Sequence, residues 1–363
     1  MISRFVFALL VVTLLLSACN LTTTADILPS DSTITITDTT GHAIILDNLP
    51  ERIVIAGSAT VMVQDTIYLF PEAPERVVAL ENRKQSAYTF LPLVDPFLDD
   101  KDMLEINAGP EQIVALQPDL VILKNFMAEK LGNPLAELGI PVIYLNLETP
   151  EIYYQDIVVL GQVFGNPERA LEIVDFYQSR VSAIEDAMSD LGEENKPDVL
   201  VLEYSEKGGD VAFQVPPTSW LQTILVQTAG GKPIWTEAVN GGGWTIITIE
   251  QIAAWDPDQI FVIDYSGSAA QVVERLISQP IWSNLKAVKN GQIYAFAFDF
   301  YSWDQPDTRW ILGLQWMATK IQPQRATEVD ILGEINDFYS HLYRIEPAIL
   351  ENEIMPKLTG DIP

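Results

Sequence analysis

Apolar and polar positions alternate along the chain in a pattern that predicts strands and helices in turn. Residues 33–38 alternate at period two, a Gly-His pair interrupts at 41–42, and residues 43–46 are apolar again, which predicts a small hairpin. Residues 52–56 form the first expected core strand, and later apolar runs each follow a segment with helical spacing. This alternation predicts an α/β protein with mostly parallel, doubly wound sheets.

An internal repeat divides the pattern into two similar halves. Residues 111–119 read EQIVALQPD and residues 250–258 read EQIAAWDPD, and an apolar strand follows each of them, at 120–123 and 259–263. A second correspondence joins GIPVIY at 139–144 to NGQIY at 290–294. Two similar α/β lobes are the simplest explanation of such a repeat. We therefore expect an N-terminal lobe at 33–150 and a C-terminal lobe at 193–323.

The segment between the two halves is expected to be helical. From residue 150 to residue 191 apolar side chains recur at helical spacing, and a Gly-Asn-Pro sequence interrupts them at 165–167. The stretch that follows has about 25 residues and would span about 40 Å at 1.5 Å per residue. The sequence thus predicts one long helix between the lobes, within 151–192. A helical extension is expected at 324–363.

The first residues of the chain predict export. Arg4 precedes an apolar run at 5–16, and Leu-Ser-Ala-Cys at 16–19 has the form of a lipoprotein cleavage site. The run is shorter than the roughly 20 residues of a lasting membrane span. We expect residues 1–18 to be a lipoprotein signal peptide, Cys19 to carry the lipid, and residues 19–32 to be a flexible tether. A secretory peptide with an incidental cysteine is the alternative.

Charge and composition exclude several classes of partner. The 363 residues include 50 acidic and 21 basic side chains, for a formal net charge of −29. Such a field repels nucleic acid and anionic lipid headgroups, so the only expected contact with a membrane is the lipid anchor. Cys19 is the only cysteine, and His42 and His341 are the only histidines. A metal site built on thiolates or on several imidazoles is therefore not expected.

No motif of a familiar enzyme class appears in the chain. The sequence has no Gly-x-Gly-x-x-Gly fingerprint, no phosphate-binding loop of the Gly-x-x-x-x-Gly-Lys type and no Gly-x-Ser-x-Gly elbow. An enzyme on a doubly wound fold is an alternative, because that architecture hosts many chemistries. We expect binding without catalysis, and no cofactor.

Several segments together resemble one family of binding proteins. They are PERIV at 50–54 with GSAT at 57–60, NAGPEQI at 107–113, PDLVI at 118–122, AGG at 229–231 and PDQI at 257–260. With the lipoprotein cleavage site and the interlobe helix, they resemble the helix-linked substrate-binding lipoproteins of ABC importers that carry ferric siderophores, haem or cobalamin. The resemblance covers essentially the whole mature chain.

The resemblance implies two α/β lobes bridged by one rigid helix, with a ligand cleft between them. It implies a monomer anchored outside the cytoplasmic membrane, in a periplasm or on a cell surface, that delivers its ligand to a permease dimer with its ATPase. An iron complex or a corrinoid is the expected ligand. The alternatives are an oxyanion such as molybdate or tungstate, and a sensory lipoprotein that is not coupled to transport.

The chain departs from the family at the positions that dock on the permease. Relatives carry an acidic residue on each lobe, whereas this chain has Val61 and Ser219 at the comparable places. Asp65 and Glu72 lie nearby and are candidates to replace the missing acid. Docking by the usual pair of acidic residues is therefore not expected.

Candidate ligand residues are taken from loops at the carboxyl ends of the expected strands, where doubly wound sheets bind ligands. Aromatic faces suit a flat macrocycle or an apolar chelate, and cations offer charge-assisted bonds. Core packing is the alternative for each aromatic residue, and an ion pair is the alternative for Arg309. The candidates in the first lobe are Ser58, Asn82, Arg83, Lys124 and Asn125; those in the second lobe are Tyr204, Trp220, Trp244, Tyr265, Tyr301, Trp303 and Arg309.

Overall fold

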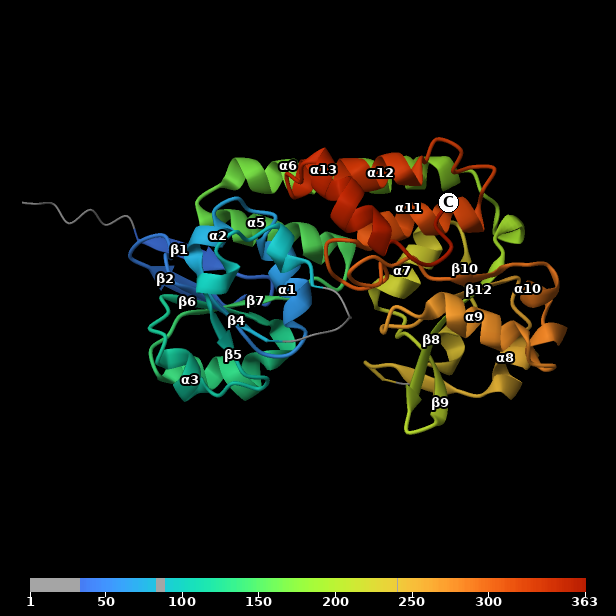
Figure 1. The fold of residues 1–363 in the computed structure, drawn as a ribbon, viewed down its shortest axis with the longest axis horizontal. Coiled ribbons are helices and arrows are strands. Elements are labelled where there is room, and N and C mark those ends of the chain that lie inside the picture. The colour runs from blue at the N-terminus through green and yellow to red at the C-terminus, as the bar shows by residue number, and fades with distance from the viewer. Residues whose placement is uncertain (1–32, 83–88, 240) are drawn as a thin grey trace, which may run out of the picture. The chain divides into compact units, whose positions relative to one another are not determined.

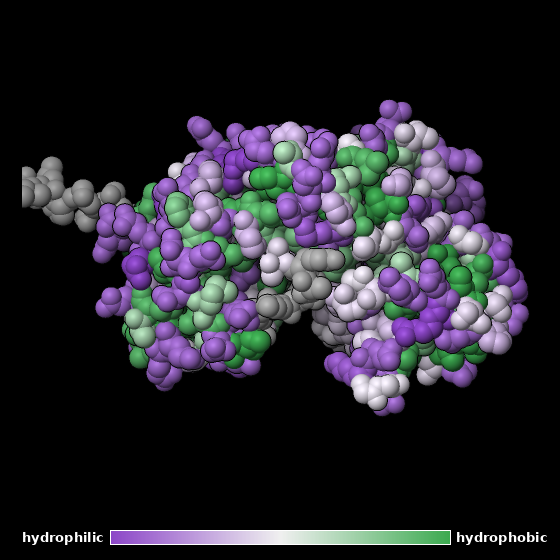
Figure 2. All heavy atoms as spheres, in the orientation of Figure 1, coloured by the Kyte–Doolittle hydropathy of each residue, from purple (hydrophilic) through white to green (hydrophobic). Residues whose placement is uncertain are grey.

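The computed structural model describes residues 33–82, 89–239 and 241–363. The expected signal peptide, Cys19, the tether and Arg83 lie outside these residues. Thr33–Pro363 form one unit, which contains two α/β lobes (Figure 1). None of the helices in the described part is long and apolar enough to cross a membrane. The face drawn in Figure 2 carries mainly hydrophilic residues, with apolar ones in small patches.

The first lobe contains a five-stranded sheet in the order β5-β4-β3-β6-β7, and every neighbouring pair in it is parallel. Its strands are β3 (Ile53–Ile55), β4 (Val77–Glu81), β5 (Asp102–Leu104), β6 (Leu120–Lys124) and β7 (Val142–Leu145). Its helices are α1 (Thr60–Ile67), α2 (Ala73–Arg76), α3 (Pro110–Val114) and α4 (Asn133–Glu137). The hairpin expected before the first core strand is confirmed as antiparallel β1 (Ile34–Thr37) and β2 (Ala43–Leu46).

The second lobe contains a mixed sheet in the order β11-β9-β8-β12-β13, with β10 paired to β8. Its strands are β8 (Asp198–Lys207), β9 (Asp210–Val215), β10 (Lys232–Pro233), β11 (Thr245–Ile247), β12 (Gln259–Ile263) and β13 (Ile293–Ala295). Its helices are α7 (Leu221–Thr228), α8 (Ile249–Trp255), α9 (Ala269–Ile277), α10 (Lys286–Lys289) and α11 (Trp310–Ile321).

A hairpin makes this second sheet mixed. β9 runs antiparallel to β8, and Lys207 pairs with Asp210 across a two-residue turn. The turn residues, Gly208 and Gly209, have φ angles of 64° and 92°, which residues with side chains rarely adopt. A Gly-Gly pair between two strand-like segments is therefore the local signal for this hairpin. The expectation of mostly parallel sheets describes the first lobe better than the second.

The internal repeat corresponds to equivalent structure in both lobes. In each copy a short helix, α3 or α8, precedes a central strand, β6 or β12. The Asp119 carboxylate accepts hydrogen bonds from the backbone N–H groups of Glu51 and Arg52, at 2.8 and 2.9 Å, just before β3. Asp258 likewise accepts from the N–H of Asp198 at 2.9 Å, where β8 begins. The Pro-Asp turn of each copy thus ties two neighbouring strands together.

The predicted interlobe helix is confirmed as α6 (Pro167–Met188), which follows α5 (Pro150–Phe164). The Asn166 side chain accepts from the N–H of Arg169 and caps α6, while Gly165 turns the chain with a φ of 66°. At 22 residues, α6 has a length of roughly 33 Å.

The C-terminal extension contains α12 (Ile331–Asp337) and α13 (Pro347–Ile349) and contacts both α6 and the first lobe. Arg180 on α6 pairs with Glu334 on α12 at 2.7 Å, and α12 lies beside α6 in Figure 1. The Tyr343 hydroxyl donates to the backbone oxygen of Asp65 at 2.9 Å. The extension therefore forms a second connection between the lobes. The domain limits expected from the sequence stay predictions.

Candidate functional site

A cavity of about 460 Å³ is lined by residues of both lobes. The first lobe contributes its wall at the carboxyl ends of β6 and β7 and at the start of α1, the edge at which such sheets bind ligands. The residues on that side are Ala59, Met62, Lys124, Asn125, Phe126, Asn146 and Glu148. Those from the second lobe are Trp220, Gln222, Gly242, Trp244, Tyr265, Gln305 and Pro306.

Charge in this cavity is limited to one ion pair among the described lining residues. The Lys124 side chain is 1% exposed and its ammonium lies 2.8 Å from the Glu148 carboxylate. The ammonium also donates to the backbone oxygen of Asn146. Glu148 balances the charge of Lys124, and the other described lining residues are uncharged. The cavity thus offers little net attraction to a small ion of either sign.

Three aromatic rings form the wall contributed by the second lobe. The Trp220 and Trp244 rings meet edge to face, with centroids 5.7 Å apart and an interplanar angle of 87°. Trp244 and Tyr265 make a similar contact at 6.3 Å. All three side chains are partly exposed. Edge-to-face packing holds the rings in place while leaving ring surface open to the cavity.

A buried carboxylate orients two of the lining side chains. Asp304 accepts from the Tyr265 hydroxyl at 2.8 Å and from the Gln222 amide at 2.9 Å. Burial raises the pKa of Asp304, and its hydrogen bonds from Ser302, Gln222 and Tyr265 act in the opposite direction. Groups fixed in this way lose little freedom when a ligand binds.

The structure brings five of the candidate residues to this cavity: Lys124, Asn125, Trp220, Trp244 and Tyr265. Ser58 is partly exposed beside the lining residue Ala59 but is not itself part of the lining. Asn82 is exposed at the end of β4 and also lies off the cavity. Tyr204 lines a separate cavity in the second lobe.

The other three candidates, Tyr301, Trp303 and Arg309, lie in the interior and do not line the cavity. Arg309 has no exposed surface, and its guanidinium contacts the carboxylates of Asp65 and Asp299. The Trp303 indole donates to Asp299 at 3.1 Å. A buried guanidinium needs such carboxylates to offset its loss of water, and here they leave no surface for a ligand.

The carboxyls around Arg309 have unusual proton affinities. Burial raises the pKa of Asp65 to about 6 and that of Asp307 to about 8, although Arg309 lowers both. The Asp65 side chain is fully buried, so it is not available to dock on a permease. Glu72 is partly exposed and accepts from the Asn166 amide at 2.7 Å. Val61 is buried, and Ser219 is exposed.

Several lining residues were not among the candidates. Phe126 is 57% exposed and directly follows Asn125 at the end of β6, so its place beyond a central strand was the available signal. Gln305 belongs to the aromatic-rich segment at 298–306. Gln222 and Glu148 have no comparable signal, because neither immediately follows a central strand. No group of three His, Cys, Asp or Glu side chains in the described ranges is arranged to hold a metal ion.

Comparisons with known proteins agree with this architecture. The family model of the periplasmic binding protein matches residues 98–299, more than half of the chain. The chain is 22% identical to the molybdate-binding protein MolA of Haemophilus influenzae, covering 92% of this chain and 96% of that protein. It is 24% identical to the iron-uptake system-binding protein of Bacillus subtilis, covering 63% of this chain and 72% of that protein.

Solved structures share the fold. The structure of the H. influenzae MolA protein bound to molybdate superposes with a TM-score of 0.70 at 19% identity, covering 85% of this chain and 98% of that one. An ABC-transporter solute-binding protein from Sulfurospirillum deleyianum gives a TM-score of 0.71 at 20% identity, covering 88% and 98% of the two chains. At these identities the likeness shows the two-lobe α/β fold.

Proposed function

This chain belongs to the periplasmic binding protein family, the solute-binding components of ABC transporters, and we propose that it captures a bulky metal chelate or corrinoid in the cavity between its lobes. The observation that carries this proposal is the wall formed by Trp220, Trp244 and Tyr265, whose rings are partly exposed at the cavity. An iron complex with an organic shell, a haem or a corrinoid presents the apolar surface that such rings bind.

The charges of the cavity support a ligand without strong net charge. A small dianion would need several unpaired donors, whereas Lys124 is already paired with Glu148. The amides of Asn125, Gln222 and Gln305 are suited to hydrogen bonds with the polar edge of a larger molecule. Relatives named for iron uptake and for vitamin B12 binding agree with this class of ligand.

Molybdate is the second candidate, and one observation favours it. The likeness to the molybdate-binding protein extends over 92% of this chain, more than the 63% matched by the iron-uptake protein. In that case Lys124 would have to turn from Glu148 toward the oxyanion. Tungstate would be expected to bind in the same way.

We further propose that the chain is a monomeric lipoprotein, anchored through Cys19, that delivers its ligand to a permease dimer with its ATPase. The ligand would favour a closed arrangement of the lobes by its higher affinity for that state. Since α6 and the C-terminal extension both join the lobes, the closing movement is expected to be small. A role in sensing is separated from transport by whether deletion of the gene abolishes uptake of the ligand.

A thermal-denaturation panel tests the identity of the ligand. The full-length protein, purified in detergent, is heated with a ferric trihydroxamate, haemin, cyanocobalamin, molybdate or tungstate, and unfolding is followed by tryptophan fluorescence. Saturation at 100 times Kd stabilises the folded state by about 2.7 kcal/mol. A saturable rise in melting temperature with a chelate or corrinoid supports the proposal. A rise with molybdate alone favours the second candidate, and no rise with any compound contradicts both.

A further inference from the structure

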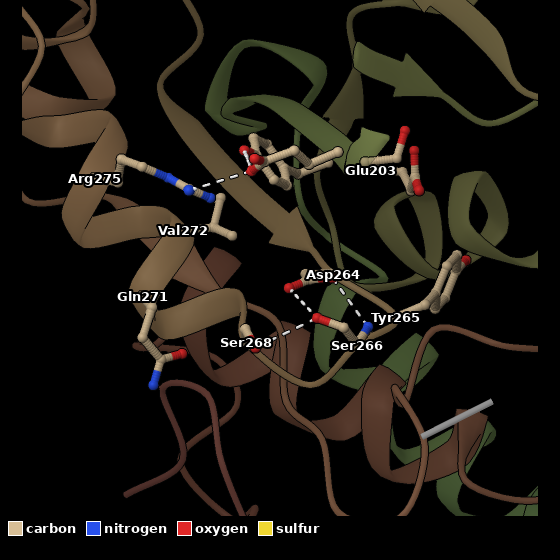
Figure 3. Close-up of a pocket in the computed structure, with 11 residues that line it drawn as sticks. Glu203, Asp264, Tyr265, Ser266, Ser268, Gln271, Val272 and Arg275 are labelled. Atoms are coloured by element: carbon tan, nitrogen blue, oxygen red, sulfur yellow. Dashed lines mark hydrogen bonds and ion pairs between the residues drawn. The ribbon is translucent and has the colours of Figure 1, made fainter. Parts of the chain in front are cut away.

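A second cavity, of about 520 Å³, lies in the second lobe beside the first one. It is bordered by the carboxyl ends of β8 and β12 and by α9 (Figure 3). Tyr265 lines both cavities, so the two are neighbours. A ligand larger than the first cavity could therefore extend past Tyr265 into the second.

The charges of this second cavity are not balanced. Its described lining includes Glu203, Glu206 and Asp264 but a single cation, Arg275. Arg275 is already engaged, because it lies 3.3 Å from the Glu206 carboxylate and over the Tyr204 ring at 5.0 Å. The Arg275 guanidinium donates to the Glu206 carboxylate, and no ion pair between described residues joins it to Glu203 or Asp264. Two carboxylates thus remain without a cation in the described part of the cavity.

Glu203 is the more unusual of these two carboxylates. Its side chain is 7% exposed, and it accepts a 2.7 Å hydrogen bond from the amide of Gln214. It forms no ion pair with a described residue. Burial raises the pKa of Glu203 and so do the nearby Asp304 and Asp264, whereas the hydrogen bond from Gln214 and the charge of Lys207 act in the opposite direction. Burying a carboxylate without a cation is costly, so a positively charged group would be favoured here.

Asp264 and two serine hydroxyls add further oxygens to the lining of the cavity. Asp264 accepts from the backbone N–H and the hydroxyl of Ser266, at 3.0 and 2.8 Å, and the Ser266 and Ser268 hydroxyls lie 3.3 Å apart. An ammonium group has three donors and no acceptor, which matches a cavity rich in carboxylate and hydroxyl oxygens. An anion would meet three carboxylates and a single cation that is already paired with one of them.

We propose that the second cavity binds a protonated amine carried on a side arm of the ligand, with Glu203 and Asp264 as its acceptors and Tyr265 as the wall shared with the first cavity. The proposal rests on the proposed function, because the body of the ligand would occupy the first cavity. It narrows the ligand to chelates or corrinoids that bear a free amine.

A matched pair of ligands tests the amine directly. Ferrioxamine B, a ferric trihydroxamate with a terminal ammonium, is compared with its N-acetyl derivative by quenching of tryptophan fluorescence in the full-length protein. Wild type is expected to bind the amine form about tenfold more tightly, the effect of one charge-assisted hydrogen bond at the low end of its range. Glu203→Gln should remove this preference and leave the affinity for the acetylated form unchanged.

Control variants separate the cavity from general charge. Glu274→Gln removes one negative charge from α9 at a residue outside the cavity lining and should keep the full preference. Asp264→Asn should reduce it partially. Melting temperatures close to wild type would show that each variant is folded. Equal affinity of wild type for the two chelates, or a preference that survives Glu203→Gln, would overturn the inference while leaving the proposed function intact.

A second probe serves the case in which neither chelate binds. That result would count against the proposed chelate function and would say nothing of the amine, so n-butylammonium is titrated alone and followed by ligand-observed NMR. Saturable binding to wild type that Glu203→Gln weakens severalfold supports the inference. Absence of binding, or equal binding to wild type and Glu203→Gln, overturns it.

Discussion

The wall of Trp220, Trp244 and Tyr265 and the interior loop at residues 298–309 have similar compositions and opposite surroundings. Both are rich in aromatic side chains, and both are formed by residues outside the strands and helices of the second lobe or at their ends. The wall is partly exposed to the cavity, whereas the loop is buried against α1 and the C-terminal extension. Tyr339 of that extension donates to Asp299, and its ring packs against Phe90 with centroids 5.8 Å apart.

The two regions differ in whether other segments of the chain pack over them, not in their composition. That packing decides whether an aromatic cluster is a binding surface or part of the core. Without residues 338–345 above it, the interior loop would be another aromatic and cationic surface at the end of a strand. The same side-chain types therefore stabilise the fold in one place and are available to a ligand in the other. The following variants ask whether the two regions differ in this way.

Removal of the Arg309 guanidinium is expected to have the largest effect. Arg309→Ala leaves Asp65 and Asp299 buried without their cation, and breaking such a pair costs about 3–5 kcal/mol. The free energy of unfolding, measured in urea, should fall by that amount. The control is Arg325→Ala, which breaks an exposed ion pair with Asp190 and should change stability little. If both variants lost a similar amount of stability, the buried ion pairs of Arg309 would contribute no more to the fold than an exposed ion pair does.

Neutralising Asp307 should have the next largest effect, and it should depend on pH. The folded state holds a proton on Asp307 up to about pH 8, because burial raises its pKa from 3.8, whereas the unfolded chain releases that proton near pH 4. Stability therefore falls as pH rises through this window. The free energy of unfolding of Asp307→Asn should fall less than that of wild type between pH 5 and pH 9. At pH 9 the variant should be more stable than wild type by on the order of 1–3 kcal/mol.

The measurement is the free energy of unfolding at the two pH values. Asparagine keeps the oxygen that accepts the 2.7 Å bond from the N–H of Arg309, so the substitution changes mainly the charge. Asp330→Asn, at an exposed residue, serves as the control and should follow the wild-type pH profile. A variant that loses as much stability as wild type over this range would show that Asp307 does not carry a raised pKa.

Truncation of a ring in the wall should affect binding more than stability. Trp244→Ala removes a partly exposed surface of the cavity, and we expect the affinity for the ligand found in the thermal panel to fall about ten- to a hundredfold. Trp255→Ala provides the matched control, since Trp255 is also partly exposed but lies on α8 outside the cavity lining. Calorimetric titration measures both. If both variants lost the same affinity, the aromatic wall would not be the surface that binds the ligand.

Local patterns predicted most of the fold correctly. The period of apolar residues located the hairpin, α6 and the central strands, and the repeat predicted two lobes because each copy encodes the same helix, Pro-Asp turn and strand. The antiparallel β9 was not predicted, although Gly208 and Gly209 marked its turn. These features are set by neighbouring residues, so a single sequence contains them.

The candidate site was predicted less completely, because it depends on contacts between distant segments. Strand ends predicted Lys124, Asn125 and Tyr265 at the cavity, since the topology of a parallel sheet brings such ends together. Nothing local to Arg309 indicates that Asp65, 244 positions earlier in the chain, encloses it. Gln222 is held at the cavity by its hydrogen bond to Asp304, 82 positions later in the chain, and no local pattern predicts that contact.

The smallest effect is expected at Phe126, which lines the cavity from the first lobe. Its side chain is 57% exposed, so Phe126→Ala exposes no core and should leave the melting temperature unchanged. Affinity should fall only two- to fivefold or so, because a ring that stays half in water gains little from a ligand. Phe97→Ala, at a ring 44% exposed and outside this cavity, is the control for calorimetric titration. A loss as large as that of Trp244→Ala would mean that both lobes contribute equally to holding the ligand, and that Phe126 becomes buried against the ligand when it binds.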